Sequence, residues 1–179
     1  MDTFCLNQHS IYLTGIINHK SIKMKKIIFL ISLFSFTLNA QKSIGTIKTG
    51  DEITKKAIEA NQAYLNQDFS VWDEIISDDA IIYVNNSKMD KNSYVEGFKS
   101  HHAIFNNISY LNSYSHTNYF KSGDIWSNTY LTWIGTGNAS GLRYSNRGVF
   151  NQKWQDGKVI EIRAYFDSAT LEAELSAMK

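Results

Sequence analysis

The chain has 179 residues, of which 43% are hydrophobic and 13% aromatic, with a formal net charge of +1. This composition is that of a single globular domain and excludes a disordered or fibrous chain. There is no excess of basic residues, so nucleic acid is not an expected partner.

The N-terminal region has the residue order of a secretory signal. Two lysines after Met24 precede an apolar run, which ends in small residues at Ala40. Residues 24–40 are therefore expected to be a signal peptide, and residues 1–23 an over-extended start. The apolar run is short for a membrane span, so an uncleaved anchor is the less favoured alternative. We expect an exported protein, periplasmic or secreted, without a stable membrane anchor after signal cleavage.

Cleavage after Ala40 would remove four of the 18 basic residues and one of the 17 acidic residues, which leaves a net charge of −2. It would also remove Cys5, the only cysteine. The mature chain would then have neither a disulfide nor a thiolate nucleophile. About 139 residues would remain, enough to bury a hydrophobic core.

Three helices are predicted after a polar leader at residues 41–50. The first spans 51–66, because apolar residues recur there at helical spacing. Asp68 is expected to cap a second, shorter helix, which is followed by a strand at 80–84. The residues that indicate the first two helices are Ile53, Ala57, Ala60 and Tyr64, then Phe69, Trp72, Ile75 and Ile76.

The third helix is expected to begin at Asp90 or Asn92. His101 is predicted to point to an adjacent, solvent-facing side of this helix. Its inner stripe consists of Val95, Phe98, His102 and Phe105.

From Ile108 onward, β-branched and aromatic residues alternate between turn signals, which predicts a meander of antiparallel strands. A short helix at 170–178 is expected to end the chain. Helices first and a strand meander afterwards indicate the α+β class. The four predicted strands lie at roughly 108–121, 125–136, 142–155 and 158–167.

Two segments carry a resemblance to a known family. SDDAIIYVNN at 77–86 and the closing GKVIEIRAYFD at 157–167, in this order of elements, resemble the nuclear transport factor 2-like superfamily, in particular its SnoaL-like branch. The resemblance covers the domain at 51–179. It implies a cone-shaped, curved antiparallel sheet packed against three N-terminal helices, with an apolar pocket between them and frequent dimerisation.

The resemblance also locates the acids that two enzyme groups of this superfamily use. In members similar to ketosteroid isomerase, the base on the first strand corresponds to Val84. In members similar to limonene epoxide hydrolase, the acid on the last strand corresponds to Ala164. Neither acid is present, so no catalytic residue is carried over. The expected pocket is apolar and lined by Ile82, Val84, Phe98, Phe150, Ile162, Ala164 and Phe166.

Strand alternation at the end of the chain places polar side chains on the other side from this pocket. Arg163, Tyr165 and Asp167 are therefore predicted to form a surface network. The glycine-rich stretch 135–141 lacks the lysine and helix of a phosphate loop, so we interpret it as a hairpin turn.

Three polar residues are catalytic candidates. His102 is a candidate general base, and a hydrogen-bonded core histidine is an equally good interpretation. Tyr64 and Tyr130 are candidate donors, although the inward face of the strand at 125–136 is not decided by its pattern. No cofactor is expected. Without cysteine and without a helical pair of histidines four residues apart, no metal site is expected either.

The sequence therefore indicates an exported SnoaL-like domain that binds a small apolar or aromatic molecule, and it leaves open whether the protein is an enzyme. One alternative is a cyclase, isomerase or dehydratase acting on a small carbonyl compound. Another is a dimeric protein-interaction module. A homodimer is expected in either case.

Overall fold

The computed structural model describes residues 43–179. The predicted signal peptide at 24–40 and the segment before it lie outside the described residues. Four helices and seven strands follow in this order: β1 (Gly45–Lys48), α2 (Glu52–Leu65), α3 (Ser70–Ile75), β2 (Ile76–Val84), β3 (Ser87–Met89), α4 (Lys91–Ile104), β4 (Phe105–Phe120), β5 (Ile125–Gly137), β6 (Arg143–Gln155), β7 (Lys158–Phe166) and α5 (Ala169–Ala177). No helix within residues 43–179 is long and apolar enough to cross a membrane.

All seven strands belong to one sheet, in the order β1-β4-β5-β6-β7-β2-β3. The predicted meander is confirmed, because β4, β5, β6 and β7 pair antiparallel in sequence. The α+β class is confirmed as well, and the sheet is mixed, because one of its strand pairs is parallel. β2 pairs parallel to β7, with Ile82 opposite Ile162. Most of the domain separates these two strands, which leaves ample chain for the crossover that parallel pairing requires.

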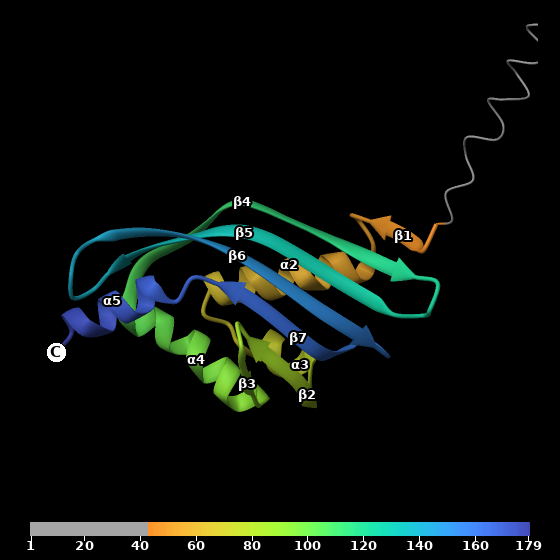
Figure 1. Cartoon of the computed structure of the whole chain (residues 1–179), viewed down its shortest axis with the longest axis horizontal. Coiled ribbons are helices and arrows are strands. Elements are labelled where there is room, and N and C mark those ends of the chain that lie inside the picture. Colours follow the sequence, from red (N-terminus) through yellow and green to blue (C-terminus); the bar gives the residue numbers. More distant parts are fainter. Residues whose placement is uncertain (1–42) are drawn as a thin grey trace, which may run out of the picture. The chain divides into compact units, whose positions relative to one another are not determined.

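Helices α2, α3 and α4 cover one face of the sheet (Figure 1). The predicted inner stripe of α2 is buried, with Ala57 2% and Tyr64 1% exposed. Ile82, Val159 and Ile162 are fully buried in the sheet beneath the helices. Burying these side chains supplies the main stabilisation of the fold, at about 1.5–3 kcal/mol for each large apolar side chain.

Three boundaries differ from the sequence prediction. Residues 45–48, expected in a polar leader, form the edge strand β1, in which Ile47 pairs with Asn118. Ile76 opens β2, although it was predicted to belong to the preceding helix. Phe105 was predicted on the inner stripe of the third helix, but its backbone is extended (φ −126°, ψ 149°) and it starts β4. Phe105 is nevertheless buried, with 3% of its surface exposed.

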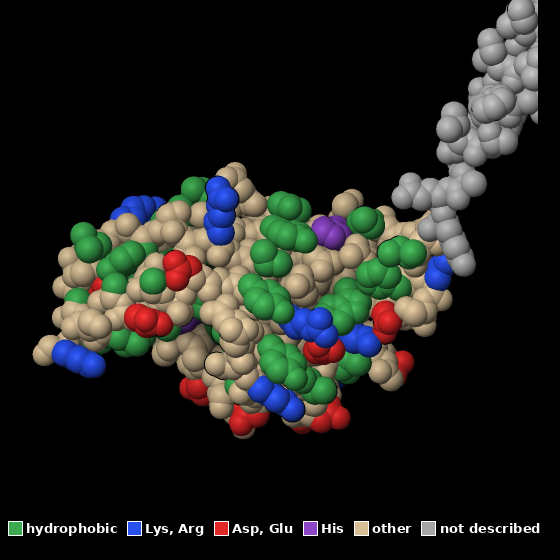
Figure 2. Space-filling view, viewed as in Figure 1, with side chains coloured by type: hydrophobic (Ala, Val, Ile, Leu, Met, Phe, Trp, Pro, Cys, Tyr) green, Lys and Arg blue, Asp and Glu red, His purple; other side chains and the backbone are tan. Residues whose placement is uncertain are grey.

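No helix of residues 43–179 covers the opposite face of the sheet. Figure 2 shows hydrophobic side chains gathered over β4 to β7 on this open face, with charged side chains among them. Tyr114 is 59% exposed and its ring stacks on Tyr130, with centroids 4.9 Å apart. The ring of His116 also stacks with that of Tyr130, with centroids 5.9 Å apart. Arg163 is paired with Glu161 on this face, and not with Tyr165 or Asp167, with which it was predicted to form a network.

The turn between β5 and β6 is held by the C-terminal helix. Glu174 of α5 is 0% exposed and its carboxylate accepts hydrogen bonds from the backbone amides of Ala139 (2.6 Å) and Ser140 (3.0 Å). The hydroxyls of Ser140 and Tyr144 also donate to it. These hydrogen bonds lower the pKa of Glu174, and the bond from the Ser140 hydroxyl makes the largest contribution. The glycine-rich stretch is therefore a hairpin turn, as predicted, and its amides bind an anion from the same chain.

Candidate functional site

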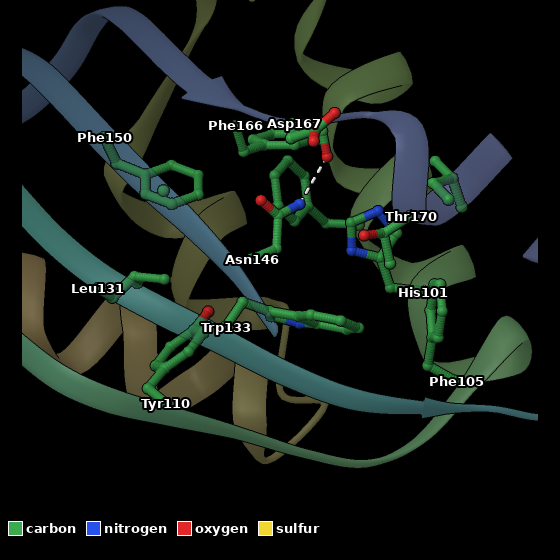
Figure 3. Close-up of a pocket in the computed structure, with 13 residues that line it drawn as sticks. His101, Phe105, Tyr110, Leu131, Trp133, Asn146, Phe150, Phe166, Asp167 and Thr170 are labelled. Atoms are coloured by element: carbon green, nitrogen blue, oxygen red, sulfur yellow. Dashed lines mark hydrogen bonds between the residues drawn. The ribbon is translucent and has the colours of Figure 1, made fainter. Parts of the chain in front are cut away.

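A cavity of about 510 Å³, counted with the space that opens to solvent, lies between α4, the inner face of the sheet and α5. Most of its wall is aromatic or aliphatic (Figure 3). The lining residues are Phe98, His101, Phe105, Tyr110, Leu131, Trp133, Asn146, Gly148, Phe150, Phe166, Asp167, Thr170 and Leu171.

Two glycines shape this cavity. At Gly148 of β6, an added Cβ would lie 3.0 Å from the ring of Phe150 and 3.6 Å from Leu131, so the missing side chain keeps this part of the wall open. At Gly135 of β5, an added Cβ would lie 2.3 Å from the indole of Trp133. Because Gly135 has no side chain, the indole of Trp133 can lie over it along β5. In this position Trp133 lines the cavity.

A hydrogen-bond chain runs from the wall of the cavity into the core. The indole Nε1 of Trp133 donates to the hydroxyl of Tyr64 at 2.9 Å, and this hydroxyl lies 3.3 Å from Nδ1 of His101. An indole N–H can only donate, so the Tyr64 oxygen is the acceptor in the first bond. Tyr64 is 1% exposed, and its own proton is satisfied only if it is donated to His101. Nδ1 of His101 is therefore the acceptor, and the neutral ring carries its proton on Nε2.

Burial, with a smaller contribution from neighbouring His102, lowers the pKa of His101 to about 4. The imidazole is therefore neutral at pH 7. Its Nε2–H has no hydrogen-bond partner within residues 43–179. His101 thus offers a ligand in the cavity a hydrogen-bond donor, and it is too weak a base to take a proton near neutral pH.

Polar groups also gather where β7 ends. Asp167 lines the cavity, and its Oδ1 accepts a hydrogen bond of 2.9 Å from the amide of Ala169 at the start of α5. The side-chain amide of Asn146 donates to the backbone carbonyl of Asp167, as the dashed line in Figure 3 shows. Asp167 was predicted to form a surface network with Arg163; it is exposed, as predicted, but its carboxylate is bonded to Ala169 and not to Arg163. The chain leaves the sheet at Asp167 to enter α5, so strand alternation no longer applies there.

The structure brings together only part of the predicted pocket lining. Phe98, Phe150 and Phe166 line the cavity. Ile82, Ile162 and Ala164 are 0% exposed and belong to the packed core, and Val84 packs against that core. These four residues do share the inner face of the sheet, but helices cover their part of that face.

The three predicted catalytic residues do not form a site. Tyr130 lies on the open face, because Thr129 and Leu131 on either side of it are the buried residues of β5. Tyr64 lies behind the cavity wall, with its hydroxyl already bonded. The ring of His102 packs 4.8 Å from that of Tyr64, and its buried Nε2 has no hydrogen-bond partner within the described chain.

His101, predicted to face solvent, takes the place expected for His102. The two histidines are adjacent, and a shift of one residue in the helical phase exchanges their directions. The other residues that sequence reasoning missed include Tyr110 and Trp133, which are opposite each other in the register of β4 and β5. The alternation in β5 does predict that Trp133 shares a face with Leu131. It does not predict which face points inward, because that depends on the packing of the helices.

No group of three or more metal-ligating side chains exists within residues 43–179. Asp167 and His101 are the only acidic residue and the only histidine among the side chains that line this cavity.

No protein-family model and no curated protein matches the sequence. Solved structures do share its architecture. IdmH from Streptomyces antibioticus, a proposed polyketide cyclase, aligns with a TM-score of 0.55 and 16% identity over 70% of this chain and 99% of its own. An NTF2-like protein from Burkholderia xenovorans aligns with a TM-score of 0.53 and 12% sequence identity. The alignment covers 67% of this chain and 92% of that protein. A proposed isomerase from Bacillus subtilis aligns with a TM-score of 0.52 and 14% sequence identity. The alignment covers 69% of this chain and 94% of that protein. At sequence identities this low, these alignments show a shared fold and carry no information on function.

Proposed function

We propose that this chain, which has the nuclear transport factor 2-like fold, binds a small apolar or aromatic molecule in the cavity between α4, the sheet and α5. The observation that supports the proposal most directly is the wall itself. Aromatic rings surround the space, and His101, a neutral residue with an unpaired Nε2–H within residues 43–179, is part of its lining. Apolar walls with a few placed polar groups are the usual composition of small-molecule sites. A ligand carbonyl would accept from His101 while the rings exclude water.

A thermal-shift screen tests this proposal. The full chain is heated with steroids, terpenoids, aromatic polyketides and fatty acids, and a ligand that binds the folded state raises the melting temperature. Gly148→Val fills the cavity, so it should abolish the rise. Gly97→Val is the matched control, because an added Cβ there meets nothing within 4 Å and should leave the rise intact. No rise with any class, or an equal rise in both variants, would overturn the proposal.

A second candidate function is catalysis on a small carbonyl compound, as a cyclase, isomerase or dehydratase. The position of Asp167 favours it, because this carboxylate lines the same cavity as His101. Asp167 would act as the base, and the neutral imidazole would donate to the carbonyl oxygen as negative charge develops there. IdmH, which shares this fold at 16% sequence identity, is a proposed polyketide cyclase.

The open face of the sheet supports a homodimer. Tyr114, Tyr165 and Ile81 are 59%, 46% and 44% exposed on it, and a second copy of the chain would cover them. This contact would leave the cavity accessible, since the cavity lies on the other face.

A further inference from the structure

A second, smaller cavity, of about 340 Å³ when the space that opens to solvent is counted, shares three lining residues with the one already described. The residues that line both cavities are Phe98, Tyr110 and Phe150, all of them aromatic. The rings of Phe98 and Phe150 have their centroids 6.1 Å apart. We call the second cavity the inner chamber. It is lined by Ala60, Asn61, Trp72, Tyr94, Phe98, Tyr110, Thr129, Phe150 and Gln152.

The inner chamber differs from the outer cavity in its chemistry. Five of its nine lining residues carry a hydroxyl or an amide, and none of them carries a charge. Tyr94 and Tyr110 have no hydrogen-bond partner for their hydroxyls within residues 43–179. Burial raises the pKa of both, with a further contribution to Tyr110 from the neighbouring tyrosines, so both hydroxyls stay protonated and can donate.

The amide of Gln152 is oriented by a hydrogen-bond chain. The indole Nε1 of Trp154 donates to Ser127 at 2.8 Å, so the Ser127 proton is free to be donated in turn. It goes to Oε1 of Gln152 at 3.1 Å, which leaves the Nε2 donor of Gln152 without a partner in the described chain.

The amide of Asn61 is oriented in the opposite sense. Its Nδ2 donates to the hydroxyl of Thr129 at 3.3 Å, which leaves its Oδ1 as an acceptor. The residues that line the inner chamber therefore have three donor groups and one acceptor without a partner in the described part of the chain.

We propose that the inner chamber binds a neutral hydroxyl group at one end of the ligand whose apolar body occupies the outer cavity. A hydroxyl both donates and accepts, so it can bond to Asn61 Oδ1 and to a donor such as Gln152 Nε2 at once. An ionised carboxylate would be buried here without a cation, which is strongly unfavourable. This inference rests on the proposed function and narrows its ligand to a hydroxyl-bearing aromatic or polycyclic compound.

Three probes with one skeleton test the inference: biphenyl, 4-phenylphenol and biphenyl-4-carboxylate at pH 7. Tryptophan fluorescence of the full chain reports binding, because Trp133 lines the outer cavity and Trp72 the inner chamber. We expect 4-phenylphenol to bind about tenfold more tightly than biphenyl, the gain from about one well-placed hydrogen bond. The carboxylate should bind more weakly than either.

Variants locate the hydroxyl. Gln152→Met keeps the side-chain length but removes the amide, so it should abolish the preference for 4-phenylphenol. Asn151→Met is the matched control, because the neighbouring residue on β6 points to the open face and should keep that preference. Tyr94→Phe removes one unpaired hydroxyl without changing the packing, and it should reduce the preference even if Gln152→Met does not fold.

The outcomes separate this inference from the proposed function. Equal binding of biphenyl and 4-phenylphenol would overturn the inner-chamber proposal and leave the apolar cavity intact as a binding site. A preference that persists in both Gln152→Met and Tyr94→Phe would also overturn it, because the hydroxyl would then be held elsewhere, as at His101. Failure of all three probes to bind would overturn the proposed function itself.

Discussion

The hydroxyl of Tyr64 joins the core to the cavity wall, and its removal is the most direct test of the site geometry. In Tyr64→Phe, the ring and its stacking stay, but the indole of Trp133 loses the acceptor of its 2.9 Å bond and His101 loses its donor. A buried donor without a partner costs about 1–3 kcal/mol, and a lost neutral hydrogen bond about 1 kcal/mol. Trp133 is only partly buried, so we take the lower end and expect a loss of about 2 kcal/mol.

Urea unfolding of the wild type and of Tyr64→Phe measures this loss. In a domain of this size, about 2 kcal/mol corresponds to a melting temperature lower by about 8 °C. Tyr130→Phe is the matched control, since the Tyr130 hydroxyl has no hydrogen-bond partner in the described chain, and its stability should change by less than about 0.5 kcal/mol. Equal losses in the two variants would refute the hydrogen-bond chain. Nitrogen chemical shifts that place the His101 proton on Nδ1 would refute it as well.

Two further predictions concern the ionisable groups of the cavity. The pKa of His101 is about 4 in the folded protein and about 6.5 in the unfolded chain, so the unfolded state binds more protons between these values. The free energy of unfolding should therefore fall by about 3 kcal/mol as the pH drops from 6.5 to 4. In urea titrations, His101→Gln should lack this part of the pH dependence. The same pH dependence in wild type and variant would contradict a buried, neutral His101. If the protein is an enzyme, Asp167→Asn should abolish turnover and leave the ligand-induced thermal shift in place, because the asparagine oxygen still accepts from Ala169; full activity in this variant would exclude Asp167 as the base.

Local patterns were sufficient for much of the fold. The stripe on α2 and the alternation in β4 to β7 are periodic signals that depend on neighbouring residues alone. Helix and strand boundaries were less certain where two elements meet without a turn, as at Ile76 and Phe105. Both residues are apolar and buried in either conformation, so hydrophobicity does not distinguish the end of a helix from the start of a strand.

The parallel pairing of β2 with β7 was not readable from either segment. Each strand is apolar on the side toward the helices, and such a pattern is equally suited to a parallel or an antiparallel neighbour. The direction of pairing was decided by the path of the chain between Val84 and Lys158, which is a tertiary property.

The sequence by itself determined the α+β class, the meander and an apolar inner face of the sheet, because these follow from the spacing of hydrophobic residues. Only the tertiary structure decided that His101 and not His102 faces the cavity, that Tyr130 lies on the open face, and that Asp167 reaches the cavity wall. Each of these depends on a rotation of a helix or strand by one residue, or on where the chain leaves the sheet. Which side chains face the cavity is decided by the packing of elements that are far apart in the sequence. The periodic pattern within one element does not predict it.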